Sequence, residues 1–225
     1  MGLCERVDEC ERGYDPSMRE VIPSLYRVES ARAGNAYLIE AGDRSVLVDS
    51  GLPSGARRVV AELAAARIPR LTDIVLTHYD PDHVGAAAAV QRETGARVWL
   101  GEADVRILRG EAEPPTRVRR WMRNAGWLGR PAIPALVELP DDAETEVVPG
   151  LVAVPAPGHT PGHHAFLWRG VAFIGDAARV SHGRLVHFPG FLISDRTAAD
   201  ATLGALAARR PRLVCPGHGA PARLA

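Results

Sequence analysis

Short apolar runs bounded by glycine and polar residues alternate along this chain with longer stretches in which apolar residues recur at helical spacing. The short runs predict strands over residues 24–28, 36–40, 45–48, 73–76 and 97–100 in the first half, and near 144–154, 164–168, 171–174 and 212–215 in the second. The longer stretches predict helices over residues 54–67, 84–94, 117–125 and 196–209. Strands and helices therefore fall into two similar groups, one in each half of the chain.

This order of elements predicts a single α/β domain over residues 21–225. Strands grouped in each half, with helices beside them, are expected to form two packed mixed sheets with helices on both outer faces, a four-layer αβ/βα sandwich. Residues 1–20 are polar and show no periodicity, so they are predicted to form an N-terminal arm. Gly95 is the expected C-terminal cap of the helix at 84–94, and Ser194 is the expected N-terminal cap of the last helix.

Residues 102–137 interrupt the strand pattern and are predicted to form a helical insertion. Its helix at 117–125 has an apolar stripe made of Val118, Trp121, Met122 and Ala125. The other sides of the helix carry Arg117, Arg119, Arg120 and Arg123. Two interpretations are open, a surface helix packed by its tryptophans and a lid over a substrate site. A nucleic-acid patch is a third and weaker interpretation, because the run is short.

The composition of the chain limits the binding partners and the cellular compartment that we expect for it. The 225 residues contain 27 Lys and Arg against 27 Asp and Glu, so no overall charge favours nucleic acid or an anionic membrane. No apolar run approaches the roughly 18 residues that span a bilayer, and no secretory signal precedes the domain. The three cysteines, Cys4, Cys10 and Cys215, do not form a disulfide framework. We expect a cytoplasmic protein, monomeric or homodimeric, that acts on a small molecule.

The residues that could bind a metal or take part in catalysis are concentrated in residues 77–85, which read Thr-His-Tyr-Asp-Pro-Asp-His-Val-Gly. Four potential metal ligands fall within six positions, namely His78, Asp80, Asp82 and His83. On one regular helix or strand these side chains would point in different directions, whereas on a tight loop between a strand and a helix they can converge. Imidazole and carboxylate groups together suit zinc, iron or manganese. The segment therefore predicts a metal-binding loop.

Three further candidates follow apolar runs in the second half of the chain. His159 lies beyond the run at 151–154, Asp176 lies beyond 171–174, and His218 lies beyond 213–215. Each has a glycine close by, which lets the backbone turn sharply and approach other groups closely. Because each candidate lies just past the C-terminal end of a predicted strand, we expect them to gather at one edge of the sandwich.

In this order the motifs resemble those of the metallo-β-lactamase superfamily, a large group of mostly dinuclear metallohydrolases. The family pattern is a strand-end Asp, then His-x-His-x-Asp-His, a later His, a bridging Asp and a final His. Its elements are matched in order by Asp49, residues 78–83, His159, Asp176 and His218. The resemblance covers most of the chain, and it implies the αβ/βα sandwich with the ligand loops along the edge between its halves.

The resemblance also implies two divalent metal ions and a role for each matched residue. The ligands of the first metal would be His78, His159 and, as a further candidate, Asp80. The ligands of the second would be Asp82, His83 and His218, with Asp176 bridging the two. A hydroxide between the metals is the expected nucleophile. Asp82 is expected to assist proton transfer to the leaving group, and Asp49 to orient neighbouring ligands.

Asp80 departs from the family pattern, which usually has His at this position. A carboxylate there can coordinate metal and shifts the preference from zinc toward iron or manganese, as in the flavodiiron branch, which carries Glu and binds iron. The alternative is that Asp80 points away and leaves the first metal with fewer ligands. Zinc remains the favoured metal, with iron and manganese as alternatives.

The favoured function is hydrolysis of an ester, lactone or thioester-type bond in a small molecule. Asp176 supports this over a true β-lactamase, many of which have Cys there. A glyoxalase is disfavoured, because such enzymes usually append a helical domain whereas this sequence ends seven residues beyond His218. An iron-dependent oxidoreductase of the persulfide dioxygenase or flavodiiron type, and a nucleic-acid processing hydrolase, are the alternatives. The remaining histidines, His163, His164, His182 and His187, are interpreted as structural or exposed loop residues.

Overall fold

The computed structural model describes residues 18–66, 68–126 and 132–225. Most of the predicted N-terminal arm therefore lies outside the described residues. Its last part is ordered, however, because strand β1 (Arg19–Ile22) pairs with β2 (Leu25–Arg27) and Met18 is buried. The folded domain thus begins earlier than the predicted boundary at residue 21.

The first sheet has seven strands in the order β1-β2-β3-β4-β5-β6-β7. Its remaining strands are β3 (Tyr37–Ala41), β4 (Arg44–Val48), β5 (Arg70–Val75), β6 (Arg97–Gly101) and β7 (Leu136–Leu139). Strands β1 to β4 are antiparallel neighbours, whereas β4 to β7 run parallel. The parallel strands bring their carboxyl ends to one edge, which is the edge that carries residues 77–85.

The second sheet has five strands in the order β14-β11-β10-β9-β8. These strands are β8 (Thr145–Val148), β9 (Leu151–Pro155), β10 (His164–Trp168), β11 (Val171–Gly175) and β14 (Leu213–Pro216). Strands β11 and β14 are parallel, so their carboxyl ends and the residues that follow them lie side by side. A separate hairpin is formed by β12 (Arg179–Ser181) and β13 (Arg184–Val186).

Side-chain alternation explains why both faces of the central strands are apolar. Leu38 and Leu47 face the helices that cover the first sheet, whereas Ile39 and Val46 face the second sheet. Successive residues of a strand point to opposite faces, so an uninterrupted apolar run is what a doubly covered strand requires. The layer between the sheets also contains Phe166 and Phe173 from the second half.

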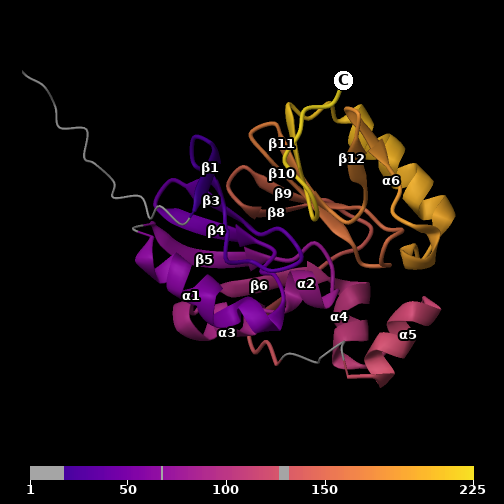
Figure 1. Ribbon diagram of the computed structural model, residues 1–225, viewed down its shortest axis with the longest axis horizontal. Helices are drawn as coiled ribbons and strands as arrows, with labels where there is room; N and C mark the ends of the chain where they lie inside the picture. The colour runs from indigo at the N-terminus through magenta and orange to yellow at the C-terminus, as the bar shows by residue number, and fades with distance from the viewer. Residues whose placement is uncertain (1–17, 67, 127–131) are drawn as a thin grey trace, which may run out of the picture.

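Helices cover the outer face of each sheet (Figure 1). On the first sheet lie α1 (Ala56–Ala65) and α3 (Ala87–Thr94), and on the second lies α6 (Arg196–Ala208), whose Leu206 packs against Ala172 and Val214. The predicted four-layer sandwich is therefore confirmed. Within the described ranges, no helix has the length and apolar character needed to cross a bilayer.

Several element boundaries differ from the predictions. The helix predicted over 84–94 is divided into α2 (Pro81–Val84) and α3, although Gly95 does cap α3 in the left-handed conformation. The cap of α6 is Asp195, which accepts a hydrogen bond from the Ala198 amide, so the prediction of Ser194 was wrong. The short strands β7, β12 and β13 were not predicted, because three or four residues carry too little periodicity.

The insertion contains two helices, α4 (Glu102–Arg109) and α5 (Arg117–Asn124), and extends into β7. The side chain of α5 that is buried is Arg119, whereas Trp121 is 58% exposed. The predicted apolar stripe therefore does not mark the buried side of this helix. Helix α5 contacts the short 3-10 helix η2 (Gly190–Leu192) from the second half, so it lies beside the edge where the candidate ligands gather.

Candidate metal centre

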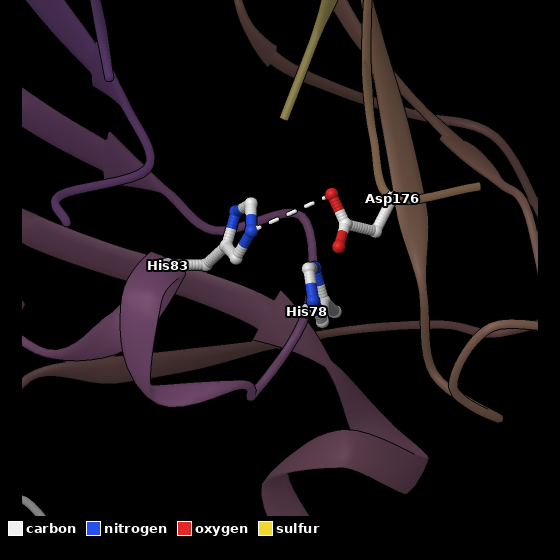
Figure 2. Close-up of side chains that lie close together, drawn as sticks. All are labelled: His78, His83 and Asp176. Carbon is white, nitrogen blue, oxygen red and sulfur yellow. Dashed lines mark ion pairs between the residues drawn. The ribbon is translucent and has the colours of Figure 1, made fainter. Parts of the chain in front are cut away.

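The candidate ligands come from loops of both halves that are joined by backbone hydrogen bonds. The His164 amide donates to the Thr77 carbonyl at 2.8 Å, and the Asn35 amide donates to the Gly217 carbonyl at 2.7 Å. Figure 2 shows the result, with His78 and His83 from the first half directed toward Asp176 from the second. Residues separated by about 100 positions in the sequence thus share one site.

The first group of converging side chains is His78, Asp80 and His159. The Nε2 atoms of His78 and His159 lie 3.4 and 3.2 Å from Asp80 Oδ2. Both imidazoles are buried, and the Asp80 side chain is 13% exposed. These are the residues expected at the first metal.

The second group is Asp82, His83 and His218. Asp82 Oδ2 lies 3.8 Å from His83 Nε2 and 3.3 Å from His218 Nε2. Two of its members are more accessible than those of the first group, because the side chains of Asp82 and His218 are 23% and 35% exposed, whereas His83 is buried. Solvent and small molecules therefore reach the centre from this side.

Asp176 lies between the two groups. Its Oδ1 is 3.6 Å from His83 Nε2, and its Oδ2 is 3.3 Å from His218 Nε2 and 3.7 Å from His159 Nε2. All seven predicted ligands are therefore brought together in the fold. A carboxylate within reach of imidazoles from both groups has the geometry that a bridging ligand requires.

The chemistry of these groups fits divalent metal ions. In the described part of the chain, His78 Nε2, His83 Nε2 and Asp176 Oδ1 are buried polar atoms without a hydrogen-bond partner. Buried polar atoms are normally paired, so three that face one another indicate a missing binding partner. Ligands about 2.1 Å from a tetrahedral metal lie about 3.4 Å apart, which matches the separations within each group.

Asp49 supports the loop from behind, as expected. It accepts hydrogen bonds from His83 Nδ1 at 2.8 Å and from the Thr77 amide at 2.8 Å, and the Thr77 hydroxyl also bonds to it. A proton held on Nδ1 leaves Nε2 of His83 free to coordinate. Asp49 adopts a left-handed backbone with φ of 56°, which aspartate tolerates better than most residues.

Protonation equilibria at the centre are displaced by the neighbouring charges. Burial would lower the pKa of His83, but the carboxylates of Asp49 and Asp176 outweigh it and raise the pKa to about 9. Hydrogen bonds to Asp176 and Asp82 raise the pKa of His218 to about 10. Since imidazole must lose its proton to coordinate a metal, metal affinity is expected to fall as the pH is lowered.

Two glycines explain how the strands approach so closely. A Cβ at Gly217 would lie 2.3 Å from Asp176 Oδ1 and 2.7 Å from His83 Cε1. A Cβ at Gly175, where φ is 47°, would lie 2.4 Å from Thr77 Oγ1. All three distances are shorter than a Cβ atom accepts, so the glycines beside the ligands are required by the packing of the centre itself.

Asp104 of α4 fixes the two ligand loops relative to each other. It was not among the candidate residues identified from the sequence. Its carboxyl accepts hydrogen bonds from the Tyr79 amide, the Thr160 hydroxyl and the Gly162 amide at 2.7 to 3.1 Å. Burial raises the pKa of Asp104 to about 7, although the bonds from Thr160 and Gly162 act in the opposite direction. No sequence motif marked this residue, because its partners come from loops far away along the chain.

Replacing Asp104 with alanine is expected to lower the free energy of unfolding by about 3 kcal/mol, because three buried donors lose their acceptor. Urea denaturation followed by circular dichroism measures this change. The matched control is Asp142→Ala, because Asp142 is an exposed aspartate in the second half of the chain. This change should alter the free energy of unfolding by less than about 0.5 kcal/mol. Equal stability of the two variants would contradict the role given to Asp104.

Arg119 is the second residue that sequence analysis missed. Its Nε and Nη2 donate to the two carboxylate oxygens of Asp80 at 2.8 and 2.7 Å, and the side chain is 1% exposed. Burial would raise the pKa of Asp80, but the Arg119 guanidinium outweighs it and holds the pKa well below its usual range. This arginine lies on a side of the helix away from the predicted apolar stripe, and that side is buried at Asp80, because a buried carboxylate requires a partner.

The other histidines divide into supporting and peripheral residues. His163 is buried, accepts a hydrogen bond from the Asp176 amide at 3.2 Å and stacks on His78, so it supports two ligands. His164 bonds to the carbonyl groups of Gly162 and Pro140. His187 pairs with Asp200 of α6, and His182 is exposed. The structural interpretation of these four residues agrees with their contacts.

Known proteins resemble this chain over most of its length. The sequence profile described as "Metallo-beta-lactamase superfamily" matches residues 30–218. The "Uncharacterized protein YobT" of Bacillus subtilis (strain 168) is 29% identical over 88% of this chain and 85% of its own. A "Hydroxyacylglutathione hydrolase" of Fuscovulum blasticum is 36% identical over 87% of this chain, which spans only 66% of that protein. The solved structure of TTHA1623 "in a di-iron-bound form" has a TM-score of 0.63 at 30% identity, covering 84% of this chain and 89% of its own.

Proposed function

Because the chain belongs to the metallo-beta-lactamase superfamily and is a metallohydrolase, we propose that it cleaves an ester-type bond in a small molecule, with a thioester as the first candidate. The observation that carries this proposal is the convergence of His78, His83 and Asp176, whose buried Nε2 and Oδ1 atoms face one another without a hydrogen-bond partner in the described chain. Two divalent metals would be held there. Zinc is favoured, with iron and manganese as alternatives.

The groups that would hold the metals are those of the two clusters. His78 and His159, with Asp80 nearby, would hold one ion; Asp82, His83 and His218 would hold the other, and Asp176 would bridge them. Bound divalent metals supply Lewis acidity at the substrate carbonyl and lower the pKa of coordinated water toward neutrality.

The protein's own residues contribute positioning and proton transfer. Asp82 lies on the open side, where the hydrogen bond from His218 overcomes the effect of burial and lowers the pKa of its carboxyl. As a carboxylate it can accept a proton and pass it to a leaving group. Phe188 closes one wall with its ring 5.3 Å from His159 and 6.0 Å from His218, so it can exclude water from the bound acyl group.

Two lines of support favour a thioester among the ester-type substrates. The relative from Fuscovulum blasticum is named for hydrolysis of an acylglutathione, which is a thioester. The ring of Phe188 lies beside His159 and His218 and provides an apolar wall on this side of the centre. An apolar wall suits an acyl or thiol portion better than a polar sugar or phosphate.

A hydrolysis assay with matched histidine variants tests this function. Metal-loaded protein is expected to release thiol from acyl thioesters faster than it opens lactones or cleaves simple esters. His218→Ala should reduce kcat/KM by about 100-fold or more, because an imidazole ligand is removed. The matched control is His182→Asn, because His182 is exposed and asparagine accepts its backbone φ of 48°. This change should leave the rate of hydrolysis unchanged. Absence of hydrolysis on all three substrate classes would overturn the proposal.

An iron-dependent oxidoreductase is the second candidate, and two observations favour it. The structural neighbour TTHA1623 was solved in a di-iron-bound form, and Asp80 adds a hard oxygen donor to the first group. Metal analysis of the purified protein together with an oxygen-consumption assay separates the candidates. Substoichiometric iron and no oxygen uptake would exclude this second function.

A further inference from the structure

The guanidinium of Arg119 is fully engaged at the first group of ligands. Besides its two bonds to Asp80, Nη2 donates to His159 Nε2 at 2.7 Å, and Nη1 donates to the carbonyls of His159 and Leu192 at 3.2 and 2.8 Å. All five N–H groups of the side chain therefore have an acceptor. Helix α5, the loop that carries His159 and the 3-10 helix η2 meet at this one side chain.

The atoms that Arg119 engages are those that a metal ion in the first group would use. Nη2 lies 2.7 Å from Asp80 Oδ2 and 2.7 Å from His159 Nε2, and both atoms belong to the group His78, Asp80 and His159. A neutral imidazole nitrogen has one lone pair, so His159 Nε2 cannot accept from Arg119 and coordinate a metal at the same time. Arginine and metal therefore compete for this ligand.

Charge distinguishes the two groups in the same direction. The negative charge of Asp80 is neutralised by the permanent charge of Arg119, whereas the ion-pair partners of Asp82 in the described part of the chain are imidazoles, which release their protons when they bind a metal. Once those protons have left, a dication in the group Asp82, His83 and His218 is attracted by the uncompensated charge of Asp82 in addition to that of Asp176, which lies between the groups. At the group His78, Asp80 and His159, the dication instead meets the positive charge of Arg119.

We propose that Arg119 acts as a resident cation of the first group, so that the two groups load metal in a fixed order. The group Asp82, His83 and His218 fills first and tightly, and the group His78, Asp80 and His159 fills second and more weakly, because Nη2 must withdraw from His159. This proposal rests on the proposed metal-dependent function, but it concerns the order of metal binding rather than turnover. Arg119 is a positioning residue here, since it acts through Asp80 and His159.

Zinc titration of the metal-free full chain by calorimetry tests the order of loading. Wild-type protein is expected to show two separate steps that differ in Kd by about 100-fold. Arg119→Met should tighten the weaker step by about tenfold or more and leave the tighter step unchanged. Arg120→Met is the matched control on the same helix, since its guanidinium bonds the Pro114 and Pro115 carbonyls; it should reproduce both wild-type steps.

Two further measurements keep the test decisive. If Arg119→Met does not fold, Arg119→Gln keeps a polar side chain beside Asp80 but removes the positive charge, so its weaker step should still tighten. In imidazole nitrogen NMR spectra, the first zinc equivalent should shift His83 and His218, and only the second should shift His159. Equal affinities in the wild type, an unchanged weaker step in the arginine variants, or an early shift of His159 would overturn the proposal.

The outcomes for the two proposals are distinguishable. Ordered zinc binding without hydrolysis of any substrate would leave the role of Arg119 intact and remove the proposed function. Hydrolysis by a protein whose two groups load zinc with equal affinity would support the proposed function and overturn the role of Arg119. Absence of zinc binding in the wild type and in every variant would overturn both.

Discussion

Replacing Asp176 with alanine is expected to lower kcat/KM by about three orders of magnitude, equivalent to about 4 kcal/mol of transition-state stabilisation. The reason is its position, because its carboxylate lies within 3.3 to 3.7 Å of imidazoles from both groups of ligands. Its loss removes the negative charge that the two proposed metal ions would share. We expect bound metal, measured by elemental analysis after dialysis, to fall from about two equivalents to one or fewer.

The control for this variant is Asp200→Ala. Asp200 is an exposed aspartate of α6 that pairs with His187 and Arg196 outside the centre. It should retain the wild-type metal content and rate, which shows that removal of a carboxylate alone has no effect. An Asp176→Ala protein with full metal content and normal turnover would refute the bridging role.

Replacing Asp49 with alanine is expected to weaken metal binding by about 10- to 100-fold and to reduce the free energy of unfolding by about 2 to 4 kcal/mol. Asp49 is buried behind the ligand loop, where it bonds with His83 Nδ1 and the Thr77 amide at the two ends of that loop. Without it, a buried amide loses its acceptor and the imidazole of His83 is free to rotate. Zinc competition with a chromophoric chelator and thermal unfolding measure the two effects.

Asp49→Asn separates orientation from charge. Asparagine keeps one carbonyl oxygen and tolerates the left-handed backbone at this position, so stability should fall by less than it does in the alanine variant. Metal affinity should still decline, because an amide does not polarise the imidazole as a carboxylate does. Identical zinc affinity in wild type and both variants would contradict the supporting role of Asp49.

The fold and the convergence of the candidate ligands could be predicted from the sequence because both depend on local patterns. Apolar runs that end in glycine and then in His or Asp mark the carboxyl ends of strands, and parallel strands place those ends at one edge. Asp176 and His218 follow two neighbouring parallel strands, β11 and β14, and so arrive side by side. The glycine next to each residue is explained by the close approach of the loops.

Arg119 and Asp104 could not be predicted, because their roles depend on contacts between distant segments. One interpretation of the apolar stripe of α5 had Trp121 packed against the domain, but Trp121 is 58% exposed and Arg119 is buried. A buried carboxylate at Asp80 costs more than an exposed tryptophan, so the helix turns its arginine inward. One signal was present in the sequence. Asp80 departs from the family pattern and adds a carboxylate that requires a cation, and the helix α5 is rich in arginine.

The most direct test of the central claim is an anomalous diffraction experiment on crystals of the full chain grown with zinc. We predict anomalous peaks about 2.0 to 2.2 Å from the imidazole nitrogens, on both sides of Asp176. The stronger peak should lie among Asp82, His83 and His218, and the weaker among His78, Asp80 and His159. Zinc bound elsewhere, with no peak within coordination distance of His83 or His218, would contradict the account.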